Sequence, residues 1–528
     1  MARYKEGNNR KQQLLFPPSL DEYVSEDNVV RVIDEYVEII DIAKLELDKK
    51  LKNSLDGQKA YNPKLFLKIY IYGYMNRVRS SRRLEAEIKR NIELMWLCEN
   101  LTPTYKTISN FRKDHSQALK KVFKEFSLML KNIDLITGDV VAVDGAFLRA
   151  NASKNQLISK RTLKQDIKEI DEKINDYLIQ LETSDKEDIG DNLLIKESKK
   201  LTNLKERKRV LDESLSMLEK IGETQYNKSD PDAKLMVKPA HNLMAYNSQI
   251  AVDSKYKFIV ATQIIQTSSD HNQLYSMATQ TKEITNNDNL TILADSGYYS
   301  AKEIDKCEQE GIEPIVPIPN KSKQQKDRGY FTHDQFQYDQ DNDCYICPNK
   351  QRLTKSKSST IRENGTINYF YRAGSKICKA CPLRDKCIPQ KTAYKRVARS
   401  EYSTTIKNYT QKMKSHKAKE FIRQRGSIVE HPFGTIKRSL GWQHYLVRGK
   451  SKVEGENALI MFTYNFKRLL NLIGITLFRE LIRAIKDNNL EQIREKIALH
   501  ITYFYSLLYY YFKMVGFYEL RRNNVTYR

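Results

Sequence analysis

The sequence predicts a mixed α/β core that is flanked and interrupted by helical segments. The first part of the chain carries apolar residues at helical spacing, with few strand-like alternations. From Asp139 onward, short β-branched runs alternate with a helical stretch, which is the pattern of an α/β domain. Helical periodicity returns near Tyr402. With 528 residues the chain exceeds one ordinary domain, so we expect several.

Residues 1–135 are expected to form an all-α N-terminal domain. Apolar residues recur at helical spacing in residues 29–42, 63–75 and 84–97. In the string TPTYKTISNFRKDH, Thr104 is placed to cap a helix whose polar face carries Lys106, Asn110 and Arg112. Such a face suits a DNA groove, although an ordinary solvated helix face explains the same pattern.

Residues 136–320 are expected to form the first part of the α/β core. Its predicted strands are DVVAVDGAFLRA, AYNSQIAVDS, FIVATQIIQT, LTILADSG and EPIVPIP. Between the first two, residues 156–222 carry leucines and isoleucines spaced alternately four and three residues apart, with Gly190 between two such runs. This spacing predicts an inserted antiparallel helical hairpin, which we interpret as structural or as serving self-association.

The remainder of the chain is expected to contain three further segments. They are a cysteine-rich basic insertion at 321–400, the C-terminal part of the core at 401–475, and a helical tail at 476–528.

The charge of the chain is strongly positive and uneven. Lys and Arg number 90 and Asp and Glu 66, which gives 90 − 66 = +24. Residues 351–425 hold 20 basic and 4 acidic residues, so 20 − 4 = +16 of this charge lies there. A merely solvated face would intersperse acids, so we expect this segment to contact nucleic acid, with Arg396 and Arg399 among the contacts.

The ends of the chain show no membrane signal. The N-terminus lacks an apolar run followed by small residues, and the apolar stretch 501–515 is too short to span a bilayer. We therefore expect a cytoplasmic protein that inserts into no membrane.

Two aspartates end apolar runs in the predicted core. Asp144 precedes Gly145, and Asp295 precedes Ser296 and Gly297. If the two strands are neighbours, their backbones lie about 4.8 Å apart and the carboxylates can share divalent cations. Each aspartate alone is also explained by a turn or a helix cap.

A third acid, Glu430, lies in the helix-prone string FIRQRGSIVEHPFGTIKRSLGW. Lys437 follows it by seven residues and therefore shares its helix face. Because Arg423, Arg425 and Arg438 are nearby, a salt-bridged surface glutamate is the plainer interpretation of this stretch alone.

Three other acids, Asp230, Asp232 and Asp270, also precede core elements. Turn formation and helix capping explain them without any ligand.

Together the strings VDG, AYNSQIAVD, ADSGYYS and VEHPFGTIKRSLG, spread over residues 61–470, resemble those of DDE transposases of bacterial insertion sequences. The resemblance implies an RNase H-like catalytic core. It also implies that the catalytic residues, which bind two Mg²⁺ or Mn²⁺ ions, are Asp144, Asp295 and Glu430. Lys437 matches a lysine that contacts DNA near the cut. We expect Arg423, Arg425 and Arg438 to contact DNA as well, although Arg423 and Gly426 replace the tyrosine and arginine of the family's extended signature, which leaves the roles of Arg423 and Arg425 open.

The activity that this resemblance implies is DNA transposition. The enzyme would bind the terminal inverted repeats of an insertion sequence, cut the DNA and transfer the strand by transesterification. Its partners would be double-stranded DNA and a second copy of itself. A non-catalytic or domesticated DNA-binding relative and a metal-dependent nuclease of the same fold are the alternatives. Because all three acids are retained, we favour a catalytic protein over the non-catalytic DNA-binding relative.

Five of the seven cysteines fall within 44 residues. Cys344 and Cys347 form one C-x2-C pair, Cys378 and Cys381 form another, and Cys387 is a rival fourth ligand. Two such pairs fit a tetrahedral structural zinc site. Reduced thiols in a small domain are the plainer alternative, and a redox role lacks a thioredoxin-like context.

Overall fold

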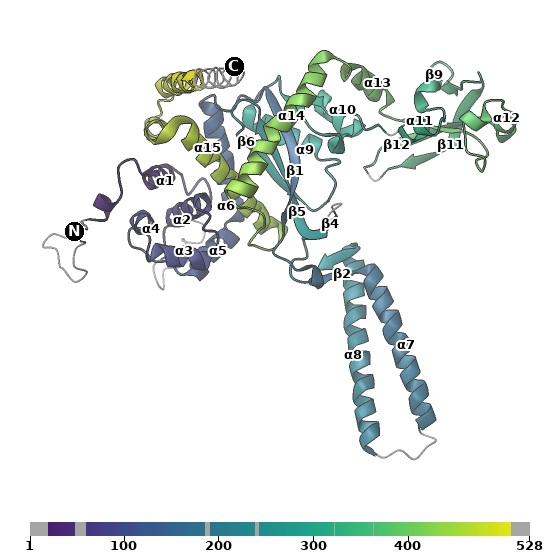
Figure 1. Cartoon of the computed structure of the whole chain (residues 1–528), viewed down its shortest axis with the longest axis horizontal. Helices are drawn as coiled ribbons and strands as arrows, with labels where there is room; N and C mark the ends of the chain where they lie inside the picture. The colour runs from purple at the N-terminus through teal and green to yellow at the C-terminus, as the bar shows by residue number, and fades with distance from the viewer. Residues whose placement is uncertain are drawn as a thin grey trace, which may run out of the picture.

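The computed structural model describes residues 19–47, 60–184, 191–237, 242–320, 323–362 and 364–507. An elongated body carries a long helical hairpin on one side and a small β-rich module at one end (Figure 1). The N-terminal helices lie at the other end of the body.

The N-terminal region is all-helical, as predicted. Its helices are α1 Val29–Glu38, α2 Pro63–Met75, α3 Ser81–Ile88, α4 Ile92–Leu97, α5 Tyr105–Asp114 and α6 Ser116–Asn132. The stretch 84–97, expected as one helix, spans two. The side chain of Asn91 accepts hydrogen bonds from the backbone N–H groups of Glu93 and Leu94 and so begins a new helix.

A mixed sheet forms the centre of the body. Its strands are β1 Val140–Arg149, β4 Lys234–Val237, β5 Asn242–Asp253, β6 Ile259–Ile265, β7 Thr291–Leu293 and β8 Glu313–Ile315. The path runs β4-β5-β1-β7-β8, with β6 also paired to β5. β1 is antiparallel to β5 and parallel to β7. This order and polarity fit an RNase H-like core.

Helices cover both faces and the ends of this sheet. They are α9 Leu274–Thr285, α10 Ala301–Gln309, α13 Ser403–Lys412, α14 His416–Gly434, a π-helical segment Thr435–Ser439 and α15 Lys450–Lys486. α15 packs against α1, α2, α5, α6 and β6. One continuous core therefore joins the N-terminal helices to the sheet. The domain boundary expected at 475/476 falls inside α15, which bends at Gly474 where φ is +76°.

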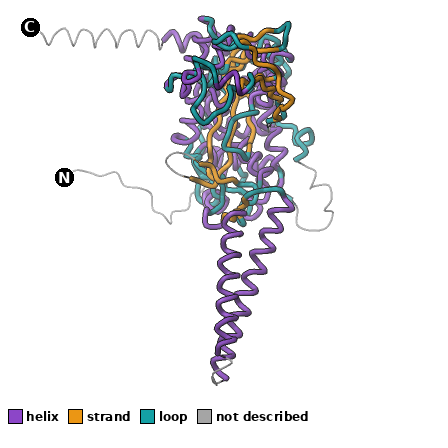
Figure 2. The backbone as a smooth tube through the Cα atoms, turned by 90° about the vertical axis from the view of Figure 1, so that its right-hand side faces the viewer, coloured by secondary structure: helices purple, strands orange, loops and turns teal. Residues whose placement is uncertain are grey.

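The expected hairpin is a narrow two-helix arm (Figure 2). It consists of α7 Lys160–Ser184 and α8 Asp191–Ile221, and a two-stranded ribbon of β2 Leu157–Ser159 and β3 Gln225–Asn227 closes its root. Leu163, Ile170 and Leu218 are buried, and Lys208 of α8 pairs with Asp171 of α7 at 2.5 Å. The turn expected at Gly190 lies outside the described residues.

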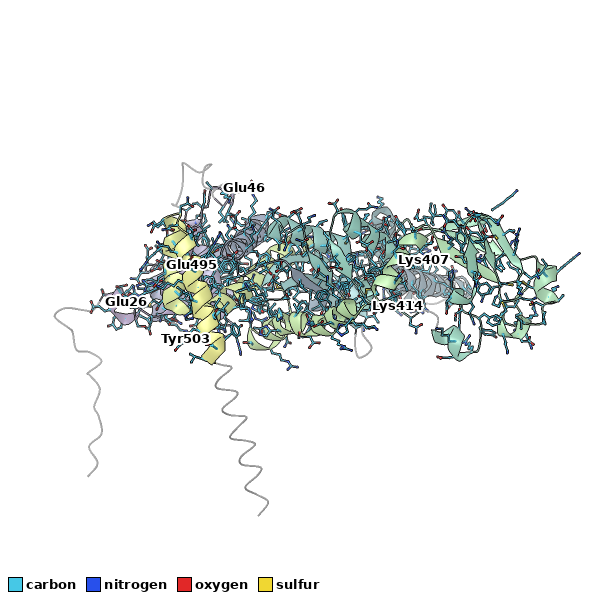
Figure 3. All side chains as sticks on the ribbon, turned by 90° about the horizontal axis from the view of Figure 1, so that it is seen from above. Glu26, Glu46, Lys407, Lys414, Glu495 and Tyr503 are labelled. Atoms are coloured by element: carbon cyan, nitrogen blue, oxygen red, sulfur yellow. The ribbon has the colours of Figure 1, made fainter. Side chains whose placement is uncertain are left out.

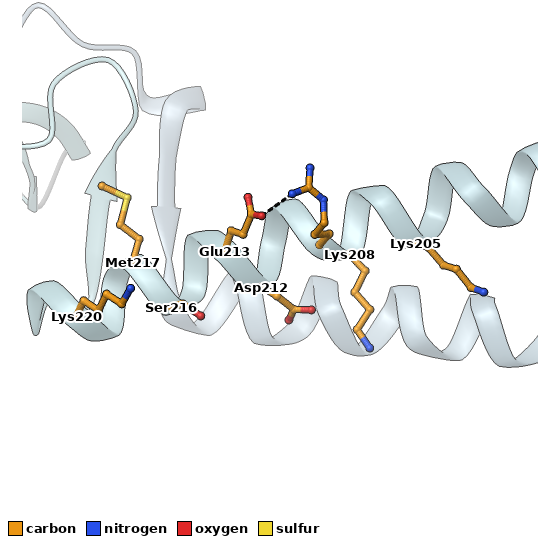
Figure 4. A pocket seen from close by; sticks show the side chains of 8 residues that line it. Lys205, Lys208, Asp212, Glu213, Ser216, Met217 and Lys220 are labelled. Atoms are coloured by element: carbon orange, nitrogen blue, oxygen red, sulfur yellow. Dashed lines mark hydrogen bonds and ion pairs between the residues drawn. The ribbon is translucent and has the colours of Figure 1, made fainter.

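A hollow on α8 does not resemble a ligand site. Lys205, Lys208 and Asp212 extend from one side of α8 and Glu213 from the other (Figure 4), and two of the charges are already paired, Lys208 with Asp171 at 2.5 Å and Glu213 with Arg209 at 2.6 Å. A binding pocket needs polar groups that converge, so we assign no ligand to this hollow.

The cysteine-bearing insertion is a module with its own core. Its elements are α11 Lys323–Asp327, β9 Gln337–Asp339, β10 Cys344–Ile346, β11 Arg352–Ile361, β12 Ile367–Arg372, α12 Ser375–Lys379 and β13 Arg396–Ser400. The strands form one antiparallel sheet in the order β13-β12-β11-β10-β9. Phe336, Tyr345, Leu353, Tyr371 and Val397 are buried in a cluster separate from the main core.

The tail of the chain is helical over residues 491–507. Ile493, Ile497 and Ile501 join the main core, so this helix packs on the body. Among the described residues, no helix is long and apolar enough to cross a membrane.

Gly455 allows α15 and α6 to cross closely. A Cβ atom at this position would lie 2.5 Å from the Cα of Ser116 and 2.9 Å from its carbonyl oxygen. We predict that Gly455→Ala lowers the free energy of unfolding by about 1–3 kcal/mol, because backbone atoms must move apart. Gly434→Ala is the control, since a Cβ there meets nothing within 4 Å. Thermal denaturation of both variants checks this, and equal melting temperatures would contradict it.

Candidate active site

The register of the two parallel strands brings Asp144 and Asp295 together. Ala142 of β1 pairs with Leu293 of β7, and each aspartate follows two residues later in its strand direction. The paired residues of β1 and β7 are mostly apolar and mostly buried. The two aspartates follow the last pair of this register, at the edge of the sheet. The Asp295 side chain accepts a hydrogen bond from the backbone N–H of Gly297 at 2.8 Å, which holds one of its oxygens.

Asp144 lies in a half-buried position among other charges. Burial is the largest influence on its carboxyl group and raises its pKa above the ordinary value. The negative charges of Asp295 and Asp270 also raise the pKa of Asp144, whereas the guanidinium of Arg425 lowers it. Arg425 approaches Asp144 to 3.7 Å and also donates to the carbonyl of Val143 at 3.5 Å. Arg425, expected as a DNA contact, therefore lies inside the carboxylate site.

Asp270 is a third carboxylate at this edge, and the sequence analysis did not assign it to the site. Its Oδ1 accepts hydrogen bonds from the side-chain amides of Asn247 at 2.8 Å and Gln249 at 2.7 Å. It does not cap α9, whose N-cap residue is Gln273. A Cβ at Gly145 would lie 2.6 Å from Asp270 Oδ1. The glycine after Asp144 is thus required by close approach, and the turn that remained as an alternative explanation of this Asp-Gly pair does not occur, because both residues lie within β1.

A buried tyrosine closes the network beneath these acids. The hydroxyl of Tyr298, whose side chain is fully buried, donates to Oε1 of Gln249. Burial, followed by the negative charges of Asp270, Asp144 and Asp295, raises the pKa of Tyr298 far above its usual value. The phenol therefore stays a neutral hydrogen-bond donor at any physiological pH.

Glu430 lies on α14, which packs on β1 and β7. Its side chain is exposed, whereas its neighbours Ile428 and Val429 are buried. By helical spacing it shares a face with Arg423 and Gly426. Across the described parts of the chain, no three His, Cys, Asp or Glu side chains are grouped closely enough to hold a metal ion as they stand. The two strand-end aspartates lie together, and Glu430 lies on a separate element, α14, that packs on the same strands.

Of the predicted DNA contacts in α5, Arg112 was assigned to the wrong face. It is 4% exposed and pairs with fully buried Glu456 at 3.4 Å, and it also donates to the hydroxyl of Tyr74. Lys106 and Asn110 are exposed, as expected. They line a polar hollow of about 460 Å³ together with residues that begin α3, among them Arg82. The exposed polar surface of α5 is thus continuous with the start of α3.

The acids near the second core strand have structural partners. Asp230 is fully buried and accepts hydrogen bonds from the Tyr246 hydroxyl and from the backbone N–H of Gly449. Asp232 accepts from the backbone N–H of Lys450 at 2.8 Å. Both acids therefore satisfy backbone groups at the start of α15, in place of a local cap.

The structure brings together four of the five clustered cysteines. Cys347, Cys378, Cys381 and Cys387 line one small apolar pocket of the module. Burial and the other three thiols raise the pKa of Cys387. Cys344 does not line this pocket. It is buried on β10 next to Tyr345, and because successive strand residues face opposite ways it points away from the module core. Cys387, the rival fourth ligand, thus lines this pocket with the other three cysteines, whereas Cys344 does not.

The basic segment is not uniformly available to a partner. Lys412 is paired with Glu308 and Glu313, at 3.7 and 3.5 Å. The guanidinium groups of Arg396 and Arg399 lie 4.0 and 4.1 Å over aromatic rings of the module. Lys407 and Lys414 are exposed and lie between the body and the module, whereas Tyr503 lies at the opposite end (Figure 3). Arg423 and Arg438 are exposed beside Glu430.

Comparisons with known proteins settle the family. Residues 18–114 match the family model described as "Transposase domain (DUF772)", and residues 346–470 match the model described as "Transposase DDE domain". The chain is a DDE-type transposase. The second match includes Glu430 and Lys437, while Asp144 and Asp295 lie before it.

Neither of two further comparisons contributes to this assignment. A solved structure titled as a piggyBac transposase synaptic complex with hairpin DNA is similar at 10% identity and a TM-score of 0.28, covering 89% of this chain and 82% of that one. The comparison with curated proteins found no significant match. The family assignment rests on the two family models.

Arg112→Ala is predicted to destabilise the transposase by about 3–5 kcal/mol, because it leaves the buried charge of Glu456 without its partner. Lys113→Ala, a change of the same charge at the next and exposed position, should alter stability by less than about 0.5 kcal/mol. Chemical denaturation of the two variants measures the difference. A small effect of Arg112→Ala would show that the guanidinium is dispensable to the core.

Proposed function

We propose that Asp144, Asp295 and Glu430 form the catalytic centre with which this transposase cuts DNA at the ends of an insertion sequence and joins it to a target. The observation that carries the proposal is the parallel register of β1 and β7, which sets two carboxylates at one sheet edge. The packing of α14 over the same strands supports Glu430 as the third member.

The chemistry of these side chains fits divalent cations such as Mg²⁺ or Mn²⁺. Hard cations prefer carboxylate oxygens, and half-buried Asp144 has two like charges beside it that a cation would offset. Two cations, when bound, would activate the attacking oxygen and stabilise the leaving oxygen of the phosphodiester. Asp144 would contribute to both cation sites, and Asp295 and Glu430 to one each.

The surrounding residues hold this centre in place and meet the DNA. Asn247 and Gln249 anchor Asp270 at the sheet edge through their amides. Arg425 balances the charge of Asp144. Exposed Arg423 lies on α14 with Glu430, and exposed Arg438 lies with Lys437 on the π-helical segment that follows, where these cations are suited to bind phosphates.

Recognition of the element ends is assigned to the N-terminal domain. Lys106 and Asn110 present a cation and an amide on the exposed face of α5, and an amide of this kind can read a base edge. The cations of the module, including Arg396 and Arg399, would add affinity that is independent of sequence. Because two DNA ends must be paired, we propose that the transposase acts on double-stranded DNA as a homodimer.

Asp144→Asn, Asp295→Asn and Glu430→Gln should each reduce strand cleavage by at least about a thousandfold, because they keep the side-chain shape but remove the charge that binds a cation. Binding of DNA should persist. Glu420→Gln is the matched control, since Glu420 is an exposed acid of the same helix whose side chain contacts Gln424. Gel assays of cleavage and binding test this, and cleavage at the wild-type rate would remove the altered residue from the centre.

We also propose that the module binds one structural zinc ion through Cys347, Cys378, Cys381 and Cys387. The support is their convergence on one pocket, where the thiols already influence one another. Four cysteines are a complete ligand set for structural zinc. The small core of the module explains why a metal is useful there, because a domain of this size buries little apolar surface.

Cys387→Ser is predicted to lower the zinc content from about one equivalent per chain to near zero and to melt the module, because structural zinc supplies folding free energy. Cys344→Ser should retain the metal, since Cys344 lies outside the pocket. Elemental analysis and limited proteolysis of both variants distinguish the two ligand sets. Zinc loss from Cys344→Ser with retention in Cys387→Ser would reverse the assignment.

A further inference from the structure

A groove with a cavity volume of about 990 Å³ runs beside the end of β1. We name it the β1-end groove and define it by its lining residues, which extend over 147–154, 242–244 and 443–444 and include Ser229, Lys437 and Arg448. It begins on the strand that carries Asp144 and reaches Lys154, three residues before the root of the hairpin at β2.

The groove is basic. Arg149, Lys154, Lys437 and Arg448 line it, and none of its lining residues is an Asp or Glu. Within the described residues, Arg149, Lys154 and Arg448 form no ion pair with a carboxylate. His444 also lines the groove, but burial and the nearby Arg79 and Arg149 lower its pKa, so it adds no charge at neutral pH.

The walls of the groove are fixed before any ligand arrives. The backbone N–H of Arg149 donates to Gln443 and its carbonyl accepts from Tyr445, at 3.1 and 2.8 Å. Arg448 donates through Nε to the carbonyl of Asn151 at 2.9 Å, and the Asn151 amide donates to Leu446 at 2.8 Å. These hydrogen bonds join the wall at the end of β1 to the wall formed by residues 443–448. Because the walls are already ordered, little conformational entropy is lost when an anion binds.

From these observations we infer that the β1-end groove binds the phosphate backbone of duplex DNA on one side of the cut. Arg149 lies five residues beyond Asp144, or roughly 17 Å along a strand. Duplex DNA rises about 3.4 Å per base pair, so the groove meets phosphates about five base pairs from the reacting one. The cations come from three separate segments, which suits a run of phosphates better than a single small anion. The inference rests on the proposed catalytic centre for its starting point.

The test compares binding of element-end duplexes that extend about 2 or about 10 base pairs past the cleavage point. The double variant Arg149→Gln, Arg448→Gln is measured at several salt concentrations without divalent cations, so that cleavage plays no part. On the longer duplex the slope of log affinity against log salt should flatten by about 1.8, since each lost phosphate contact is worth about 0.9. On the shorter duplex the double variant should match the wild type.

Two controls keep the result interpretable. Lys199→Gln, Lys200→Gln removes the same charge from exposed positions on α8 and should change neither slope nor length dependence. Arg149→Lys, Arg448→Lys keeps the charge and should retain most of the affinity, which excludes a general folding defect. An unchanged slope in the glutamine variant, or an equal loss on both duplexes, would overturn the inference. Failure of the catalytic proposal would appear separately, as cleavage by Asp144→Asn.

Discussion

Helix α15 lies between the N-terminal helices and the sheet and is buried on all sides from Gly455 to Phe466. Apolar contact alone would let such a helix slide. Buried polar side chains fix its position: Asn465 exchanges two hydrogen bonds with the backbone of Ile259, and Asn457 accepts from Ser248 and Tyr445. The position of α15 in turn fixes the segment between α14 and α15. This segment follows the helix that carries Glu430 and contributes Gln443, His444 and Arg448 to the β1-end groove.

The parts of the site that the sequence predicts are those set by local pattern. Asp144 and Asp295 end apolar runs, and strand neighbours bring such residues together whatever lies around them. The expected helix does carry Glu430, but it ends at Gly434 and Lys437 lies on the π-helical segment that follows, so the seven-residue spacing does not by itself place Lys437 on the face of Glu430. The order of the elements, the hairpin and the separate module also follow from periodicity and composition. These features depend on residues that are close in sequence and not on long-range contacts.

Residues whose place depends on distant partners were not predictable in this way. Arg112 has the spacing of an exposed helix residue, and only the arrival of Glu456 from α15 explains its burial. Cys344 belongs to a C-x2-C pair, yet strand alternation turns it away from Cys347's pocket. Asp270 has the position of a helix cap, and the amides that hold it come from another strand. For Arg112 and Asp270 long-range contacts outweigh the local signal, and for Cys344 the strand in which it lies does so.

The hairpin arm enters and leaves the body at one point, because β2 and β3 pair at its root. The module likewise keeps its own core apart from that of the body. An insertion whose two ends meet imposes no stretch on the framework that hosts it, so its length can drift without moving the sheet. A change in the length of the hairpin arm therefore need not alter the spacing of the strand-end carboxylates in the sheet.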